Sequence, residues 1–268
     1  MNKSFLSTLF ILSVSTFLFG QTKILSWNIQ DLGRSKSAEE LNFMAEQMKA
    51  YDLIAIQEVV AKDPAGAQAV AKLADLLNRK GGRWDYRISD PTRSSPSRSE
   101  RYAYIWRTSK VRLVGRPWLE KSVAGVIFRE PYLAKFLTDS GDLLMVNYHS
   151  RVWKEKPEVE IDLMLQFNQL YPDHRILIAG DFNKHSDDAY FDKISRYGWA
   201  ISPLNEKTTL KRSCKSGGYR NRPIDFFMYE AQEFRINASG VHDFVGSCEN
   251  LLQARQISDH LGVWLEVE

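Results

Sequence analysis

Polar residues stand where several short apolar segments of the sequence stop. Polar groups that gather at the strand ends of a layered fold are more typical of a functional site than of a core. Each one alone has a structural explanation, such as a turn former, a helix partner or a structural histidine. The inference of a site therefore depends on the whole set, which consists of Asn28, Glu58, His149, Asp181, Asn183, Asp225, Asp259 and His260.

The residue types in this set suit one kind of chemistry. Glu58, Asp259 and Asn28 offer hard oxygen ligands, which Mg²⁺ and Mn²⁺ prefer. Two histidines, His149 and His260, allow one imidazole to take a proton from water while the other protonates a leaving oxygen. A carboxylate beside each imidazole would fix its tautomer and raise its basicity. Metal-assisted hydrolysis of a phosphoester requires this combination.

Short apolar strands, with helices between some of them, must position these residues. A capping-box pattern from Ser37 to Glu40 predicts the start of a first helix, and Pro64–Arg79 is expected as a second. Helical spacing returns over Glu158–Tyr171 and near Asp187–Arg196. The expected strands are Lys23–Ile29, Asp52–Gln57, Trp84–Ile88, Tyr102–Arg107, Val111–Pro117, Val126–Phe128, Leu133–Leu137, Leu143–Tyr148, Arg175–Ala179, Ile224–Tyr229, Phe234–Asn237 and Gly262–Val267. Because no low-complexity linker divides the chain, we expect one domain with two packed sheets flanked by helices.

Length and composition exclude several classes of protein. The 268 residues are 44% hydrophobic and 26% charged, which excludes a disordered chain. Two cysteines exclude a disulfide-scaffold miniprotein and a zinc site built mainly from cysteine.

Residues 1–20 combine Lys3, an apolar run broken only by Ser and Thr, and Gly20 before Gln21, the pattern of a secretory signal peptide. A buried N-terminal helix or a retained anchor is the alternative.

A signal peptide at 1–20 implies a domain at 21–268, secreted or periplasmic, with no membrane insertion after cleavage. An oxidising compartment favours a disulfide between Cys214 and Cys248. Two unrelated buried thiols are the alternative.

The net charge of +3 conceals an asymmetry along the chain. Residues 79–121 hold twelve Lys/Arg against four Asp/Glu, and residues 205–222 hold six against one, net charges of +8 and +5. The remainder of residues 21–268 then carries −11. Basic stretches and an acidic remainder favour a polyanionic partner and a carboxylate-rich metal site. Solvated charge scattered over the surface is the alternative.

Four segments carry a resemblance that extends over essentially all of residues 21–268. In order along the chain they are Ser26-Trp27-Asn28-Ile29, Ile56-Gln57-Glu58-Val59, Gly180-Asp181-Phe182-Asn183 and Ile257-Ser258-Asp259-His260. This ordered set resembles the endonuclease/exonuclease/phosphatase superfamily, and within it the secreted deoxyribonuclease I-like nucleases. Glu100-Arg101-Tyr102 and Phe128-Arg129-Glu130-Pro131 resemble the deoxyribonuclease branch in particular. The resemblance implies an α/β (α+β) fold, a four-layer α/β/β/α sandwich of two mainly antiparallel sheets flanked by helices, with the site at one edge of the two facing sheets.

The resemblance also implies roles for the histidines and the metal ligands. His260, oriented by Asp225, would take the proton from the attacking water. His149, oriented by Glu100, would protonate the leaving 3′-side oxygen. Glu58 would hold the divalent metal, with Asn28 and Asp259 close by. The metal is expected to be Mg²⁺, with Mn²⁺ as the alternative, and Ca²⁺ is a further ion that the resemblance allows.

The remaining roles concern the phosphates of the substrate. Asp181 and Asn183 would position the scissile phosphate and stabilise its developing charge, and Arg129 would contact a phosphate. Arg98 stands where the family pattern has a tyrosine that enters the minor groove, and it would enter a narrow groove or contact a phosphate.

The sequence departs from the deoxyribonuclease pattern at two further places. Val59-Val60-Ala61 follows the metal glutamate where the pattern has an arginine. Ile224-Asp225-Phe226 replaces a Tyr-Asp-Arg motif. These positions touch nucleic acid in the family, so the hydrolytic residues are retained while the recognition of DNA grooves is altered.

These observations together predict a secreted, monomeric, divalent-metal-dependent endonuclease that hydrolyses DNA with low sequence specificity. One alternative has the same fold but acts on a lipid headgroup, as a sphingomyelinase does. Another is a catalytically inactive binding module. Glu100 with Arg129 argues against the lipid enzyme, and the complete set of catalytic residue types argues against the inactive module.

Overall fold

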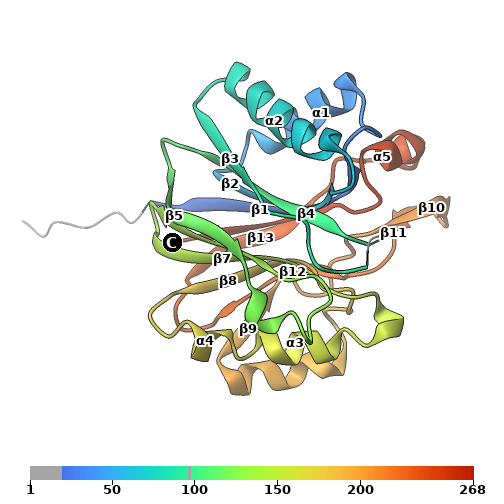
Figure 1. Ribbon diagram of the computed structural model, residues 1–268. Helices are drawn as coiled ribbons and strands as arrows, with labels where there is room; N and C mark the ends of the chain where they lie inside the picture. The colour runs from blue at the N-terminus through green and yellow to red at the C-terminus, as the bar shows by residue number, and fades with distance from the viewer. Residues whose placement is uncertain (1–19, 96–97) are drawn as a thin grey trace, which may run out of the picture.

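Two six-stranded sheets face each other, with helices on both outer faces (Figure 1). The computed structural model describes residues 20–95 and 98–268. The segment expected as a signal peptide therefore lies outside the described residues, except for Gly20. The prediction of an α/β sandwich with two sheets between helical layers is confirmed.

The first sheet has the strand order β13-β14-β1-β2-β4-β3. Strands β1 (Thr22–Leu32) and β2 (Leu53–Val60) pair in parallel, and the other pairs are antiparallel. Helices α1 (Ala38–Met48) and α2 (Pro64–Arg79) cover its outer face. The other elements on this side are β3 (Trp84–Ile88), β4 (Glu100–Arg107), β13 (Ile236–His242), β14 (Gly262–Val267), the 3-10 helix η4 (Cys248–Asn250) and α5 (Leu251–Ile257).

The second sheet has the order β5-β6-β7-β8-β12-β9. Its one parallel pair is β7 (Gly141–His149) with β8 (Ile176–Asp181). Helices α3 (Glu158–Met164) and α4 (Phe167–Leu170) and the 3-10 helix η3 (Ala189–Tyr197) cover the outer face. The other elements are β5 (Val111–Leu119), β6 (Tyr132–Thr138), β9 (Trp199–Ser202), β12 (Asp225–Glu230), the hairpin β10 (Leu210–Lys215) and β11 (Gly218–Arg220), and the 3-10 turns η1 (Lys121–Val123) and η2 (Trp153–Glu155).

Period-two alternation along the strands divides the core into layers. In β1, Ile24 packs between the two sheets, whereas Leu25 and Trp27 pack under the helices. Met145 of β7 and Phe227 of β12 face Ile24 across the inter-sheet layer. This alternation also decides which polar residues at the strand ends face the space between the sheets.

The start of α1 and the disulfide follow local signals in the sequence. Ser37 caps α1 as predicted, because its hydroxyl accepts a hydrogen bond from the Glu40 backbone N–H at 3.2 Å. The Glu40 carboxylate in turn accepts from the Ser37 backbone N–H at 2.7 Å. The disulfide between Cys214 and Cys248 is present and joins β10 to η4, with 5.9 Å between the Cα atoms. Among the described residues, no helix is long and apolar enough to cross a membrane.

Three of the expected elements differ from the structure. The predicted strand Val126–Phe128 is wrong: the segment is a turn whose amides at 126 and 127 bond back to Val123, so only single apolar residues reach the core. The helix expected over Glu158–Tyr171 breaks at Leu165–Gln166 into α3 and α4. The strand expected at Phe234–Asn237 starts later and forms β13.

Candidate active site

The ends of six strands, together with the segment just before β14, converge on one edge of the sandwich. Asn28, His149 and Asp181 share the alternation of the inward-facing residues of their strands, so their side chains enter the space between the sheets. Asp225 opens β12 on the same side as Phe227, and Glu100 opens β4 on the same side as two buried tyrosines. The site is thus assembled across the interface of the two sheets.

Glu58 reaches this space only through a backbone irregularity. Ile54 and Ile56 face the helices, so strict alternation would place Glu58 on the helical side as well. The pairing of β2 with β4 shifts between Ile56 and Val59, and Glu58 has a φ of 61°. Bulges of this kind re-aim side chains beside functional sites. The result is a contact of 3.0 Å between the Glu58 carboxylate and the Asn28 amide.

His149 is held from one side by a buried ion-pair network. Its Nδ1 lies 3.0 Å from Glu100 Oε2, and Arg129 Nε lies 3.0 Å from the same oxygen. Burial disfavours the charged imidazole, but the charge of Glu100 outweighs it, so the pKa of His149 is raised. Arg129 is anchored in turn by donating to the backbone oxygen of Ser150 at 2.8 Å. The free Nε2 of His149 therefore faces the centre of the site.

His260 is held in the same way from the other sheet. Its Nδ1 lies 2.9 Å and 3.0 Å from the two oxygens of Asp225, and Thr208 donates a 2.6 Å hydrogen bond to Asp225 Oδ2. Burial opposes protonation of this imidazole too, but Asp225 and Asp181 together raise its pKa well above the ordinary value. Trp27 fixes the backbone by donating its indole N–H to the carbonyl of His260 at 3.0 Å.

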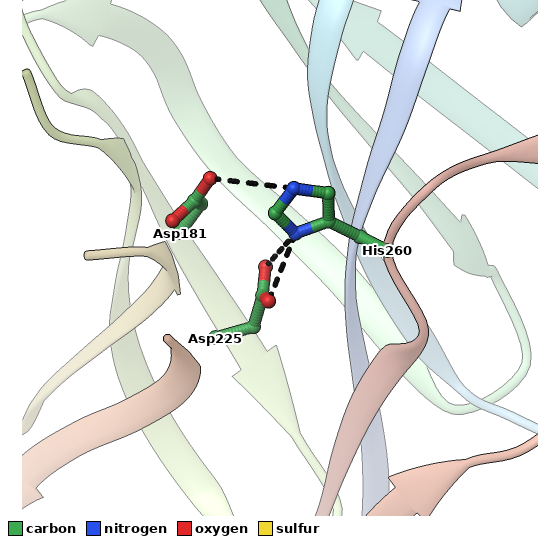
Figure 2. A group of neighbouring side chains, drawn as sticks. All are labelled: Asp181, Asp225 and His260. Carbon is green, nitrogen blue, oxygen red and sulfur yellow. Dashed lines mark hydrogen bonds and ion pairs between the residues drawn. The ribbon is translucent and has the colours of Figure 1, made fainter. Parts of the chain in front are cut away.

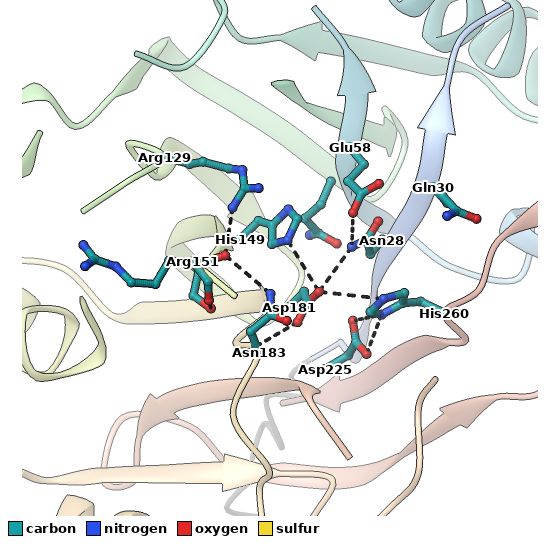
Figure 3. A network of polar contacts seen from close by, with 12 residues as sticks. Asn28, Gln30, Glu58, Arg129, His149, Arg151, Asp181, Asn183, Asp225 and His260 are labelled. Carbon is teal, nitrogen blue, oxygen red and sulfur yellow. Dashed lines mark hydrogen bonds and ion pairs between the residues drawn. The ribbon is translucent and has the colours of Figure 1, made fainter. Parts of the chain in front are cut away.

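Asp181 lies between the two histidines. Its Oδ2 is 3.5 Å from His149 Nε2 and 3.8 Å from His260 Nε2 (Figure 3). Asn28 Nδ2 donates to the same oxygen at 3.3 Å. Burial, reinforced by the charge of Asp225, raises the pKa of Asp181. Two imidazoles, each backed by its own carboxylate, thus point at one central carboxylate.

Oxygen atoms at the centre of the site suit a cation. The ligand atoms of Asp181, Asp225 and His260 lie within 4.8 Å of one another among the described residues (Figure 2), but Asp225 is already engaged by Thr208 and by His260 Nδ1, so the free oxygens lie on the side of Asn28 and Glu58. The Oδ1 atom of Asn28 is buried and has no hydrogen-bond partner within the described chain. Burial also raises the pKa of Glu58, because the neighbouring protein groups do not fully compensate its negative charge. An unpaired carbonyl oxygen beside an under-compensated carboxylate fits a hard divalent cation.

The remaining predicted residues lie at increasing distances from this centre. Asn183 donates its backbone N–H to Asp181 at 2.8 Å and has a φ of 47°. Asp259 is partly exposed, and its Oδ1 lies 4.0 Å from His260 Nε2. Arg98 is not brought into the cluster: it is half exposed in a loop and bonds Glu155 at 2.7 Å. The phosphate contact predicted for Arg98 would therefore lie at the rim of the site, away from the catalytic centre.

Gly180 allows the two central strands of the second sheet to meet at the site. A Cβ atom at this position would lie 1.7 Å from the carbonyl oxygen of Tyr148, and the φ of Gly180 is 151°. The next pair in the register is His149 with Asp181. The glycine thus sets the close approach that places the imidazole beside the carboxylate.

Sequence reasoning missed two supporting hydroxyl groups. Thr208 is fully buried and donates to Asp225. It lies in the basic stretch 205–222, in which only the net charge indicated a function. Ser258 lies in the segment Ile257-Ser258-Asp259-His260, but the sequence predicts no role for it. Its hydroxyl donates to the Asn28 carbonyl at 2.7 Å and accepts from the His260 backbone N–H at 3.0 Å. Single-sequence patterns do not detect such hydroxyl groups, because Thr208 lies 17 positions before Asp225 and a serine two positions before a histidine is common.

Comparison with known proteins places this geometry in a family. Residues 25–260 match the model of the Endonuclease/Exonuclease/phosphatase family. A deoxyribonuclease of Thioalkalivibrio sp. (strain K90mix) is 29% identical over 187 residues, which cover 65% of this chain and 50% of the relative, so the chain spans about half the length of that protein. Deoxyribonuclease-1 of Oryctolagus cuniculus is 25% identical over 222 residues, covering 79% of this chain and 76% of the relative.

Solved structures show the same fold at lower identity. An endonuclease/exonuclease/phosphatase family protein from Leptotrichia buccalis C-1013-b has a TM-score of 0.65 at 17% identity, covering 92% of this chain and 99% of its own. D. rerio TDP2 complexed with single strand DNA product has a TM-score of 0.62 at 16% identity, with the same coverage of both chains.

Proposed function

The chain belongs to the endonuclease/exonuclease/phosphatase family, and from that premise we propose that it is a divalent-metal-dependent endonuclease. Its substrate is DNA, in which it hydrolyses phosphodiester bonds with low sequence specificity. The similarity to two deoxyribonucleases supports DNA as the substrate. The signal-peptide pattern and the disulfide support secretion.

One observation carries the proposal. Two buried imidazoles approach the same carboxylate from different sheets, at 3.5 Å and 3.8 Å, and each has its own carboxylate behind it. An inactive binding module would have no need to keep two such pairs aligned. General acid–base catalysis of hydrolysis needs one group that accepts a proton and one that donates it, on opposite sides of the reacting phosphorus.

The proton transfers follow from the two pairs. Asp225 holds the Nδ1 proton of His260 and directs Nε2 to the centre. Asp225 and Asp181 raise the pKa of His260, and a divalent cation bound beside Asp181 would lower it again, which would leave Nε2 able to accept a proton from the attacking water. Glu100 holds His149 in the same manner, and the raised pKa of His149 favours the protonated form that gives its proton to the leaving oxygen. Asn183 and Arg129 both donate to the Ser150 carbonyl beside His149, and we expect further N–H groups of these two residues to bind the phosphate oxygens.

Glu58 and Asn28 would hold the divalent cation, with Asp181 on the other side of the Asn28 amide. When bound, Mg²⁺ or Mn²⁺ polarises a phosphoryl oxygen and offsets the negative charge of the surrounding carboxylates. Asp259, partly exposed at the rim, completes the oxygen set that the sequence predicts.

The basic stretches supply the attraction for a polyanion. Arg222 lies next to the β10–β11 hairpin and has no ion-pair partner in the described part of the chain. Binding to DNA through such residues weakens steeply as salt rises.

A plasmid assay tests the proposal. The mature protein with Mg²⁺ should nick supercoiled DNA, and a chelator should abolish the nicking. His149→Ala and His260→Ala should each lower the rate by about 10²-fold or more, since each removes a general acid or base. His174→Ala is the matched control, because His174 precedes β8 at the end opposite Asp181. Unchanged nicking by both active-site variants would contradict the assignment.

A second substitution addresses the metal. Glu58→Gln keeps the shape of the side chain but removes its charge. We expect the Mg²⁺ concentration for half-maximal activity to rise by at least about tenfold, as metal sites lose affinity when their ligands or supports are altered. Turnover of sphingomyelin or a phosphoinositide without any nicking would select the lipid-headgroup enzyme instead.

A further inference from the structure

The loop after β7 leaves a tryptophan exposed beside the candidate active site. Trp153 begins η2, four residues after His149, and 57% of the residue is exposed. Tryptophan is among the side chains that gain most from burial, so an indole held open to solvent at a site edge suggests a ligand that covers it.

A cavity of about 370 Å³ opens at this tryptophan. Trp153, Pro157 and Ile224 supply apolar surface to it, and Asn183, Lys184 and Arg222 supply polar groups. Its size falls within the usual range of about 300–1,000 Å³ for small-ligand sites. We refer to it as the Trp153 cavity.

The Trp153 cavity adjoins the catalytic centre through Asn183. Asn183 lines the cavity and also donates its backbone N–H to Asp181 at 2.8 Å. Its side-chain amide reaches Ser150 O at 3.4 Å, which ties the start of the tryptophan loop to the site. Whatever occupies the cavity therefore lies next to a phosphate held between the two histidines.

The charges around the cavity limit the type of occupant. Lys184 is balanced by Glu158 and Asp188, each at 2.7 Å, whereas Arg222 is exposed and has no ion-pair partner within the described residues. An acyl chain entering here would desolvate the Lys184 network, which is costly. A flat, partly polar ring with a phosphate attached would stack on the indole, hydrogen-bond at the rim and place its charge near Arg222.

We propose that the Trp153 cavity binds one nucleobase of the substrate strand, adjacent to the scissile phosphate. The inference rests on the proposed nuclease function and makes it more specific. The base faces in a duplex are covered by neighbouring base pairs, so only an unpaired or locally opened nucleotide can stack on Trp153. The protein consequently favours single-stranded DNA, or opened positions in a duplex, over relaxed double-stranded DNA.

The test compares three variants on one substrate. Trp153→Ala removes the stacking surface, Trp153→Phe keeps an aromatic ring, and Tyr197→Ala is the control. Tyr197 is 49% exposed and lies near Trp199, which pairs with Glu230 at the end of β12 opposite Asp225. Stacking of one base on an aromatic side chain is worth about 1–3 kcal/mol, so we expect Trp153→Ala to raise KM for a single-stranded oligonucleotide about 5- to 150-fold. The other two variants should stay within about threefold of the wild type.

Abasic substrates locate the base that is bound. Single abasic sites are placed in turn on either side of one cleavage position. In the wild type, one position should raise KM as much as the alanine substitution does, and the same abasic site should add nothing in Trp153→Ala. The ratio of single-strand to duplex cleavage should fall in Trp153→Ala and stay constant in Tyr197→Ala.

The outcomes separate this inference from the proposed function. Cleavage of DNA by Trp153→Ala with unchanged KM, or additive effects at every abasic position, overturns the base site and leaves the nuclease intact. Absence of any nucleic acid cleavage by the wild type overturns both. Loss of binding to phosphatidylcholine–phosphatidylglycerol vesicles in Trp153→Ala, with DNA cleavage unaltered, overturns the base site in favour of a lipid contact.

Discussion

Replacing Asp225 by asparagine should change the tautomer of His260. The Thr208 hydroxyl accepts from the amides of Ile224 and Asp225 at 3.2 Å and 3.1 Å, so its lone pairs are taken and it can only donate to position 225. Because Thr208 cannot accept from an NH₂ group there, the asparagine oxygen is favoured in the place of Oδ2, 2.9 Å from His260 Nδ1, although Arg222 O offers the Thr208 hydroxyl a second acceptor at 3.1 Å. The NH₂ group then takes the place of Oδ1, which lies 3.0 Å from the same nitrogen.

An NH₂ donor this close competes with the oxygen for Nδ1 and favours the tautomer that carries the ring proton on Nε2, while loss of the carboxylate charge removes the group that stabilises the protonated imidazole. Both effects make the nitrogen that faces the centre a poorer acceptor of a proton from water. Loss of general base catalysis costs about 10²–10⁴-fold, and the equivalent aspartate-to-asparagine change in a serine protease triad costs about 10⁴-fold. We expect kcat for DNA hydrolysis by Asp225→Asn to fall within this range.

Initial rates of plasmid nicking at saturating Mg²⁺ measure the effect. Asp162→Asn is the matched control, because Asp162 is half exposed on α3 and pairs with Lys193 on the outer face. Asp225→Asn in the His260→Ala background should cause no further loss, since the carboxylate acts through the imidazole. Retention of more than a tenth of the wild-type rate, or additive losses in the double variant, would refute the tautomer argument.

Three further predictions concern stability. Gly180→Ala should lower the free energy of unfolding by more than about 3 kcal/mol in urea titrations, because its methyl group would overlap the Tyr148 carbonyl; a loss below about 1 kcal/mol would contradict this. Replacing Cys214 and Cys248 by serine should cost about 3–4 kcal/mol by the chain-entropy model for a separation of 34 residues, and an unchanged urea midpoint would show that the bridge does not stabilise the fold. Burial lowers the pKa of His242 below the ordinary value of about 6.5, so the unfolded state binds the extra proton and stability is lost as pH falls below about 6.5. His242→Gln should therefore flatten the fall in the urea midpoint between about pH 7.5 and pH 5.5, whereas equal slopes for the two proteins would exclude the effect.

Regular alternation made much of the site predictable from sequence. A strand that is buried on both faces gives a largely apolar run, and a polar residue where the run stops marks the edge of the sheet. Asn28, His149 and Asp181 were identified in this way, and the structure brings them together. The cap of α1 and the disulfide were predictable because each depends on two residue types at a known spacing or in a known compartment.

Irregular backbone was not predictable by the same means. Period-two alternation assigns Glu58 to the helical face, and only the bulge with positive φ turns it toward Asn28. The hairpin β10–β11 was missed because its residues are mostly polar and only one of them is buried, so no apolar alternation marks it. The Trp153 cavity combines residues from three separate loops, a juxtaposition that depends on tertiary packing.

The path of the chain through the first sheet has a consequence for when the protein can act. Strand β14 pairs with β1, the first strand, and His260 lies just before β14. A chain that emerges in order from a ribosome or a translocation channel therefore holds every strand of the second sheet before β13 and β14 can complete the first. Chemistry that needs His260 must wait for that last pairing, whose long sequence separation also makes it slow to form. The strand order thus delays activity until β14 has paired with β1.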